Sequence, residues 1–355
     1  YGMHEMSDDS SAVRAMLLAL VPKMESCRED FDSQAVGNSL YGMKCMSSEG
    51  AEVRKMLLAL VPRVKSCKEA LDPQAVASCL YGMNGMSSDI YEVRTMLTAL
   101  IPKLESCRQA LSAQHTSNCL YGMQGMSSDH AEVRAILLAL VPKVESCRED
   151  FNAQNIGNTL YGMQRMSCDS PEVCTMLLVL ASKVETCRDP LDEQAVGNTL
   201  YGMQGMCSDS VEVCAMLSAL VPKVESCRNA LNAQAVSNAL YGMQGMSSDS
   251  SEVCAMLVAL LPKIENCKET LNAQHVGTAL YGMKGIRTED LSLPVLDFLF
   301  DSTKTVVGNP ALCESLLCVE LISLGQHLAL TLPAIQMQRN GYERWENIFL
   351  LITNE

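Results

Sequence analysis

Residues 241–250, "YGMQGMSSDS", contain the tripeptide that reveals how this chain is organised. Tyr-Gly-Met occurs eight times, always forty residues after the previous copy. Its tyrosines are Tyr1, Tyr41, Tyr81, Tyr121, Tyr161, Tyr201, Tyr241 and Tyr281. A constant period of this length, without insertions, is typical of stacked helical repeats rather than of a globular enzyme. The sequence therefore predicts one tandem array over residues 1–286, and because Tyr1 falls inside a repeat we expect the array to be truncated there.

The composition disfavours several classes of protein. The 355 residues carry a formal net charge of −14, which is unfavourable for binding nucleic acid. The 17 cysteines include one per repeat at a regular apolar position, which indicates small buried side chains in a reducing intracellular compartment. No cysteine and histidine spacing resembles a zinc site, and no apolar run is long enough to span a membrane.

The first helix of each repeat is predicted from "LNAQAVSNALYGMQGM", residues 231–246. Asn232 is the expected N-cap, because its side chain can accept a hydrogen bond from the first turn. Val236, Leu240 and Met243 share one side of this helix at 100° steps, and they are the expected core face. The equivalent N-cap candidates are Asp32, Asp72, Ser112, Asn152, Asp192 and Asn272.

The opposite side of this helix carries Gln234, Asn238 and Tyr241. The glutamine recurs in every copy, and asparagine recurs in five of the seven. Gly242 follows the tyrosine, and a glycine stands there in every copy. Glycine inside a helix costs about 1 kcal/mol relative to alanine, so we expect it to allow a close approach between the first helices of neighbouring repeats.

The second helix is predicted over residues 247–271, where apolar residues recur at helical spacing from Val253 to Cys267. Asp249 and Glu252 have the spacing of a capping box. The same pair recurs as Asp89/Glu92, Asp129/Glu132, Asp169/Glu172 and Asp209/Glu212. Proline lies inside this helix in six copies, and because the apolar period continues through it we expect a kink rather than a loop.

These patterns predict an all-α fold: a right-handed α-solenoid of seven forty-residue helix pairs, with the first helices on the concave side. The period is lost after Ile286. Residues 287–355 still have helical patterns, and we expect them to form a degenerate helical C-terminal cap.

The stretch at residues 231–246 resembles the first helix of the octotricopeptide repeat family and of the helical repeats that precede RAP domains in organellar proteins. That family has a Pro-Gln, Ala-Asn, Leu-Trp-Ala pattern. Asp72-Pro73-Gln74 comes closest to it, and tyrosine stands where tryptophan is usual. The chain lacks the family's Pro-Pro-Pro-Glu-Trp segment and a recognisable RAP domain. The resemblance implies RNA binding in a chloroplast or mitochondrion, in transcript maturation or translation.

The candidate site is the polar face of the first helices. Its residues are Gln114, Asn118, Gln154, Asn158, Tyr161, Gln194, Asn198, Tyr201, Gln234, Asn238 and Tyr241. Side-chain amides can donate and accept, so this row can bind an extended backbone. The alternative is that the amides bond to one another and to loop backbones between repeats. His115 and His275, at matching positions, are expected to be variation without a role.

Two basic rows recur along the second helices. One contains Lys23, Arg63, Lys103, Lys143, Lys183, Lys223 and Lys263, and the other contains Arg28, Lys68, Arg108, Arg148, Arg188, Arg228 and Lys268. Either row can in principle follow phosphates. Glutamates such as Glu105 stand three residues before the second row, at ion-pair spacing, which favours a self-neutralised outer surface.

No group of residues has the pattern of a catalytic site: there is no glycine-rich phosphate loop and no Ser-His-Asp order. We therefore expect a protein that is not an enzyme and holds neither cofactor nor metal. The favoured interpretation is an α-solenoid scaffold that binds a protein partner, or builds part of an organellar assembly, through its concave face. The alternative is an organellar RNA-binding repeat protein.

Overall fold

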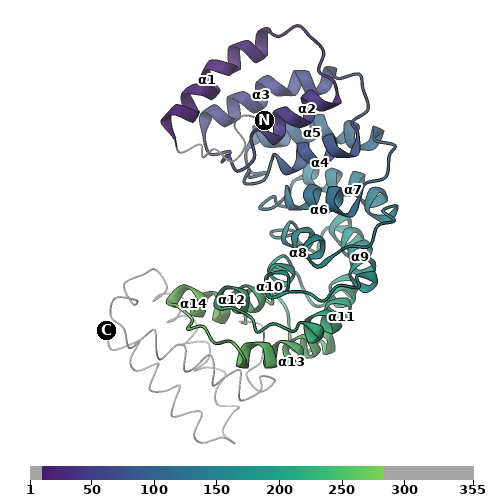
Figure 1. Ribbon diagram of the computed structural model, residues 1–355, viewed down its shortest axis with the longest axis vertical. Coiled ribbons are helices and arrows are strands. Elements are labelled where there is room, and N and C mark those ends of the chain that lie inside the picture. The colour runs from purple at the N-terminus through teal and green to yellow at the C-terminus, as the bar shows by residue number, and fades with distance from the viewer. Residues whose placement is uncertain (1–9, 284–285, 287–355) are drawn as a thin grey trace, which may run out of the picture. The chain divides into compact units, whose positions relative to one another are not determined.

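The computed structural model describes residues 10–283 and 286 (Figure 1). Within this part of the chain all regular secondary structure is helical, in fourteen helices. The chain forms two compact units, Tyr1–Arg188 and Asp189–Glu355. The expected C-terminal cap over 287–355 lies outside the described residues.

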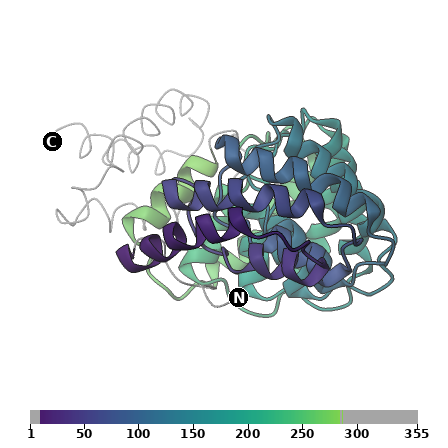
Figure 2. The same cartoon turned by 90° about the horizontal axis from the view of Figure 1, so that it is seen from above.

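In unit 1, long and short helices alternate. They are α1 (Ser11–Ser26), α2 (Ser33–Tyr41), α3 (Ala51–Ser66), α4 (Pro73–Tyr81), α5 (Tyr91–Ser106), α6 (Ala113–Tyr121), α7 (Ala131–Glu145), α8 (Ala153–Tyr161) and α9 (Pro171–Thr186). We call the short helices A helices and the long ones B helices. Each A helix packs on the next A helix and each B helix on the next B helix, which makes two parallel rows (Figure 1). Figure 2 shows α1 and α3 lying side by side along their lengths.

Unit 2 repeats this arrangement with α10 (Glu193–Tyr201), α11 (Val211–Ser226), α12 (Ala233–Tyr241), α13 (Ser251–Glu265) and α14 (Ala273–Gly282). The A helices α10, α12 and α14 follow one another, and so do the B helices α11 and α13. The fold is the predicted all-helical α-solenoid. Its handedness, its repeat count and the concave position of the A helices stay predictions.

The A helices begin where the sequence predicts and end earlier. The side chain of Asn232 accepts a hydrogen bond from the backbone N–H of Ala235, and Asn272 does the same for His275, each at 2.8 Å. The other five predicted N-caps are confirmed in the same way. The helix ends at Tyr241, so the prediction of one helix to residue 246 was wrong. Gly245 has φ +87°, a left-handed conformation that ends the helical course.

The B helices start later than expected, and the capping box was wrong. In α13 the N-cap is Ser250, whose Oγ accepts from the N–H of Val253 at 3.4 Å, and Asp249 lies one residue outside the helix. The pairs at Asp89, Asp129, Asp169 and Asp209 are displaced from the N-cap in the same way. Each B helix continues through its proline. Pro62 and Leu58 both lie on the exposed side of α3, where the carbonyl that proline leaves unbonded can be hydrated.

Glycine after the repeated tyrosine allows the close approach of A helices, as predicted. A Cβ built on Gly122 would lie 2.0 Å from the carbonyl oxygen of Leu80, and one on Gly242 would lie 1.9 Å from that of Leu200. Real Cβ atoms do not come this near to backbone, so no side chain fits. Gly122 has φ −65°, which any residue adopts, and the requirement is therefore for space rather than for conformation.

A row of serines also joins consecutive repeats. The Oγ atom of Ser88 accepts a hydrogen bond at 2.9 Å from the N–H of Ser127, which lies thirty-nine residues later. Ser48, Ser128 and Ser208 accept in the same way. These hydroxyls satisfy loop N–H groups that would otherwise be buried without a partner.

Candidate functional site

The A helices of each unit present the three predicted polar positions on one side. Among the described residues, the glutamine position is exposed in all seven copies. The core residues Val36 and Val236, by contrast, are buried. The asparagines are half-buried, and so are the described tyrosines of the Tyr-Gly-Met repeats except the exposed Tyr281. Unit 1 contains the predicted Gln114, Asn118, Gln154, Asn158 and Tyr161, and unit 2 contains Gln194, Asn198, Tyr201, Gln234, Asn238 and Tyr241. Their role in binding stays a prediction.

Most amides of this face form no hydrogen bond within the described part of the protein. We call the glutamine and asparagine rows of the A helices the amide face. Its members without a protein partner among the described residues are Gln34, Asn38, Gln114, Asn118, Gln154, Asn158, Gln194, Asn198 and Gln274. Gln234 is different, because its Nε2 donates to Oδ1 of Asn238 at 2.7 Å. Gln74 also bonds within its helix, to Oγ of Ser78 at 3.2 Å. Mutual bonding therefore explains only a minority of the amides.

The tyrosines form a stacked row beside the amide face in each unit. The ring centroids of Tyr121 and Tyr161 are 5.8 Å apart, and those of Tyr201 and Tyr241 are 5.5 Å apart. The hydroxyl of Tyr241 accepts from Nε2 of Gln204, one repeat earlier, at 2.9 Å. Burial raises the pKa of the Tyr121 hydroxyl. With their faces against one another, the rings offer edges to a ligand and leave no gap into which a base or a proline ring could insert.

The two matching histidines have a role that the sequence analysis missed, so that expectation was wrong. Nε2 of His115 lies 3.3 Å from Oε1 of Gln74, and Nε2 of His275 lies at the same distance from Oε1 of Gln234. Nδ1 of His115 also accepts from the N–H of Ser112 at 3.4 Å, which completes a capping box. Burial lowers the pKa of both imidazoles. Each histidine thus engages the glutamine of the repeat before it.

The first basic row caps helices and does not follow phosphates. Nζ of Lys183 donates to the carbonyl of Cys147 at 2.7 Å, and Lys103 donates to that of Cys67. Lys143 and Lys263 bond to the equivalent carbonyls of Cys107 and Cys227. Each acceptor lies at the C-terminal end of the preceding B helix, where the partial negative charge of the helix favours a cation. This row joins repeats and is not available to an anionic ligand.

Two members of the second basic row pair between repeats rather than within a helix. Nζ of Lys68 lies 2.7 Å from Oδ2 of Asp30, and the Arg188 guanidinium lies 3.7 Å from that of Asp150. The predicted pairing with the glutamate three residues earlier was wrong. In the part of the chain that the structure describes, Glu105 and Arg108 form no ion pair, because α5 ends at Ser106 and the arginine is no longer one helical turn away.

The described cysteines are free thiols. Cys67, Cys107, Cys147, Cys187 and Cys227 of the one-per-repeat row are buried, as predicted. Cys79 and Cys119 of the A helices are also buried, and desolvation raises the pKa of both thiols. Such thiols are unreactive, because the thiolate is disfavoured. Among the described residues, no group of histidine, cysteine and carboxylate side chains is arranged to hold a metal ion.

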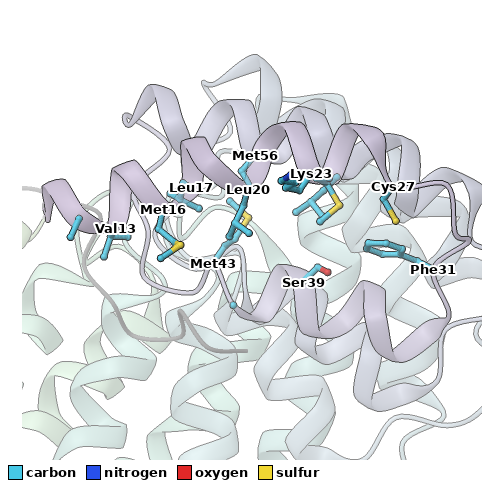
Figure 3. Close-up of a pocket in the computed structure, with 14 residues that line it drawn as sticks. Val13, Met16, Leu17, Leu20, Lys23, Cys27, Phe31, Ser39, Met43 and Met56 are labelled. Carbon is cyan, nitrogen blue, oxygen red and sulfur yellow. The ribbon is translucent and has the colours of Figure 1, made fainter.

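A cavity of about 720 Å³ lies among α1, α2 and α3 (Figure 3). Met16 and Leu20 of α1 point into it, together with Met43 of the turn after α2 (Figure 3). Met16 is 54% exposed and Leu20 is 41% exposed, whereas Met56, at the position of Met16 in α3, is 5% exposed. The lining is therefore the same apolar stripe that packs B helices together, and it lacks the convergent polar groups of a small-molecule site.

None of the described helices has the length and apolar character needed to cross a bilayer. Comparison with known proteins gives no further guide to the site: no family model matches the chain, and no curated protein is similar to it.

Proposed function

We propose that this chain is a non-enzymatic α-solenoid scaffold that binds a protein partner through the amide face of its A helices. One observation carries the proposal: in the described residues nine amides of this face, five exposed and four half-buried, have no protein partner. The first basic row and the serine row have internal bonds, in contrast, which supports the amide face as a part left for a ligand. The organellar setting rests on the family resemblance alone.

Charge supports a protein partner over a nucleic acid. Non-specific affinity for RNA comes mainly from cations that neutralise phosphates. The lysines that recur once per repeat are used to cap B helices, as Lys103 and Lys183 show. Along the A helices the recurring charges are carboxylates at the N-caps, such as Asp72 and Asp192. With a net charge of −14, the chain offers little to a polyanion.

The test replaces four unbonded amides of unit 1, Gln114, Asn118, Gln154 and Asn158, with alanine. The full chain and this quadruple variant are used to capture partners from a nuclease-treated extract of the source cells. We expect the protein captured by the parent to be lost, while the melting temperature is unchanged, because no internal hydrogen bond is removed. Gln109→Ala, in the exposed loop after α5, is the matched control and should retain capture.

Two other results would decide against the proposal. If the quadruple variant melts several degrees earlier, the amides hold repeats together and are not a binding face. If the parent instead elutes with RNA, and its affinity falls steeply with salt, the protein is an RNA-binding repeat protein.

A further inference from the structure

Two neighbouring repeats of unit 1 carry the longest described run of unbonded amides within one unit. Gln114 and Asn118 lie on α6, and Gln154 and Asn158 lie on α8, which packs directly against α6. Both glutamines are exposed, and both asparagines are half-buried. The run is interrupted on α4, where Gln74 bonds to Ser78 and to His115.

The separation of the tyrosine rings beside these amides matches two residues of an extended polypeptide. Ring centroids in the tyrosine row of unit 1 are 5.8 to 6.0 Å apart from one repeat to the next. An extended chain advances about 3.1–3.4 Å per residue, so two residues cover about 6–7 Å. In a strand every second residue points its N–H and C=O toward the same side. Each repeat therefore meets one outward pair of backbone groups.

A carboxamide is suited to that pair, because it has an N–H donor and a carbonyl acceptor side by side. A helical ligand would not use it, since its backbone groups are already bonded to one another. The amides carry no charge, and they therefore favour a neutral backbone over a phosphate chain. We infer that the amide face of α6 and α8 binds the main chain of an extended polypeptide segment, with two ligand residues per repeat. This inference rests on the proposed function.

The third residue of the next A helix controls whether an amide is available. His115 occupies this position on α6 and engages Gln74 of α4. Asn155, at the same position on α8, donates instead to Ser117 at 3.2 Å and leaves Gln114 unbonded. Removing the His115 imidazole therefore frees the Oε1 acceptor of Gln74 for a ligand, while Nε2 of Gln74 stays bonded to Ser78.

The experiment uses display to select random linear peptides that bind the full chain. Peptides on the order of twelve residues are long enough to cover more than the two repeats at this rise per residue. One selected peptide is then synthesised in two N-methylated forms. One form, or phase, carries N-methyl groups at the odd-numbered residues and the other at the even-numbered residues. We expect one phase to lose at least about tenfold in affinity and the other to change little, because only one set of N–H groups meets the amides. Asn118→Ala with Asn158→Ala should give a similar loss, and Gln109→Ala none.

The gain-of-function variant His115→Ala should bind a peptide extended at one end several-fold more tightly, because Oε1 of Gln74 becomes available as an acceptor, although its Nε2 still bonds to Ser78. Equal losses in both N-methyl phases, a helical bound peptide, or no peptide that depends on the amides would overturn the inference. These results leave the proposed function standing if the cellular partner is still lost with the quadruple variant. If that partner is retained by the quadruple variant, the proposed function fails.

Discussion

Replacing Gly122 with alanine adds one methyl group at the closest approach of two A helices. Its Cβ would lie 2.0 Å from the carbonyl oxygen of Leu80, 2.3 Å from the carbonyl carbon and 2.6 Å from the backbone nitrogen of Tyr81. All three atoms belong to backbone, so no rotamer change relieves the overlap. To reach an ordinary contact of about 3.4–3.5 Å, α4 and the end of α6 must separate by more than 1 Å locally.

Two effects of opposite sign act on this variant. Gly122 has φ −65°, so without the overlap alanine would stabilise the fold by about 0.4–1 kcal/mol through the unfolded state. Overpacking costs about 1–3 kcal/mol, and here the neighbouring atoms are the least adaptable kind. We expect a net loss of about 2 kcal/mol, or roughly 4–8 °C in melting temperature for a unit of this size.

The assay is thermal unfolding of the full chain followed by circular dichroism. Gly125→Ala is the matched control, because no atom lies within 4 Å of its Cβ and the cost comes only from φ +80°. That cost is about 1–2 kcal/mol and involves no neighbouring helix. In Gly122→Ala the tyrosine stacking should also change, visible in near-ultraviolet circular dichroism, and in Gly125→Ala it should not. A Gly122→Ala protein that melts at or above the parent would refute the close approach.

Three more predictions follow from contacts between or within repeats. Lys103→Met removes the ammonium that caps the helix ending before Cys67, and should lower the free energy of unfolding by about 1–2 kcal/mol in urea, whereas the exposed Lys55→Met should change it little. Burial lowers the pKa of His115 below its ordinary value of 6.5, so the folded state resists protonation and the free energy of unfolding falls as the pH drops below that value. His115→Gln should therefore reduce the loss of melting temperature between about pH 7.5 and 5.5. An unchanged pH profile would contradict this. Cys45 is exposed with φ +66°, and Cys45→Gly should stabilise by about 1 kcal/mol, seen as a higher melting temperature.

The features that sequence predicts well are those decided inside one repeat. The apolar spacing of the helices, the N-cap at Asn232 and the exposed position of Gln234 each depend on neighbours within a few residues. The glycine prediction also succeeded, because eight copies at a position that costs helix stability require a spatial reason. The errors at helix ends have a local cause too: Gly245 is a turn signal in the sequence, and its positive φ ends the helical course.

The features that sequence missed join residues about forty positions apart. Lys103 meets Cys67, and His115 meets Gln74, only because one repeat is stacked on the next at a particular offset. The period predicts that neighbouring repeats touch, but not which rows meet. The signal for the lysines was present, since a cation recurs near the end of every B helix, where a helix carries partial negative charge.

The internal contacts explain why the amide face, rather than another polar row, is the candidate site. A repeat must satisfy the ends of two helices and a loop against its neighbour, and Lys183 and Ser88 show how charged and hydroxyl rows serve these needs. A row used in this way varies little between copies whether or not the protein binds anything. The residues at the positions of Gln154 and Asn158 also recur, in seven and five of the seven copies, yet Gln154 and Asn158 form no internal hydrogen bond among the described residues. Their recurrence therefore needs a cause outside the repeat stack, and a ligand that follows the array from repeat to repeat supplies one.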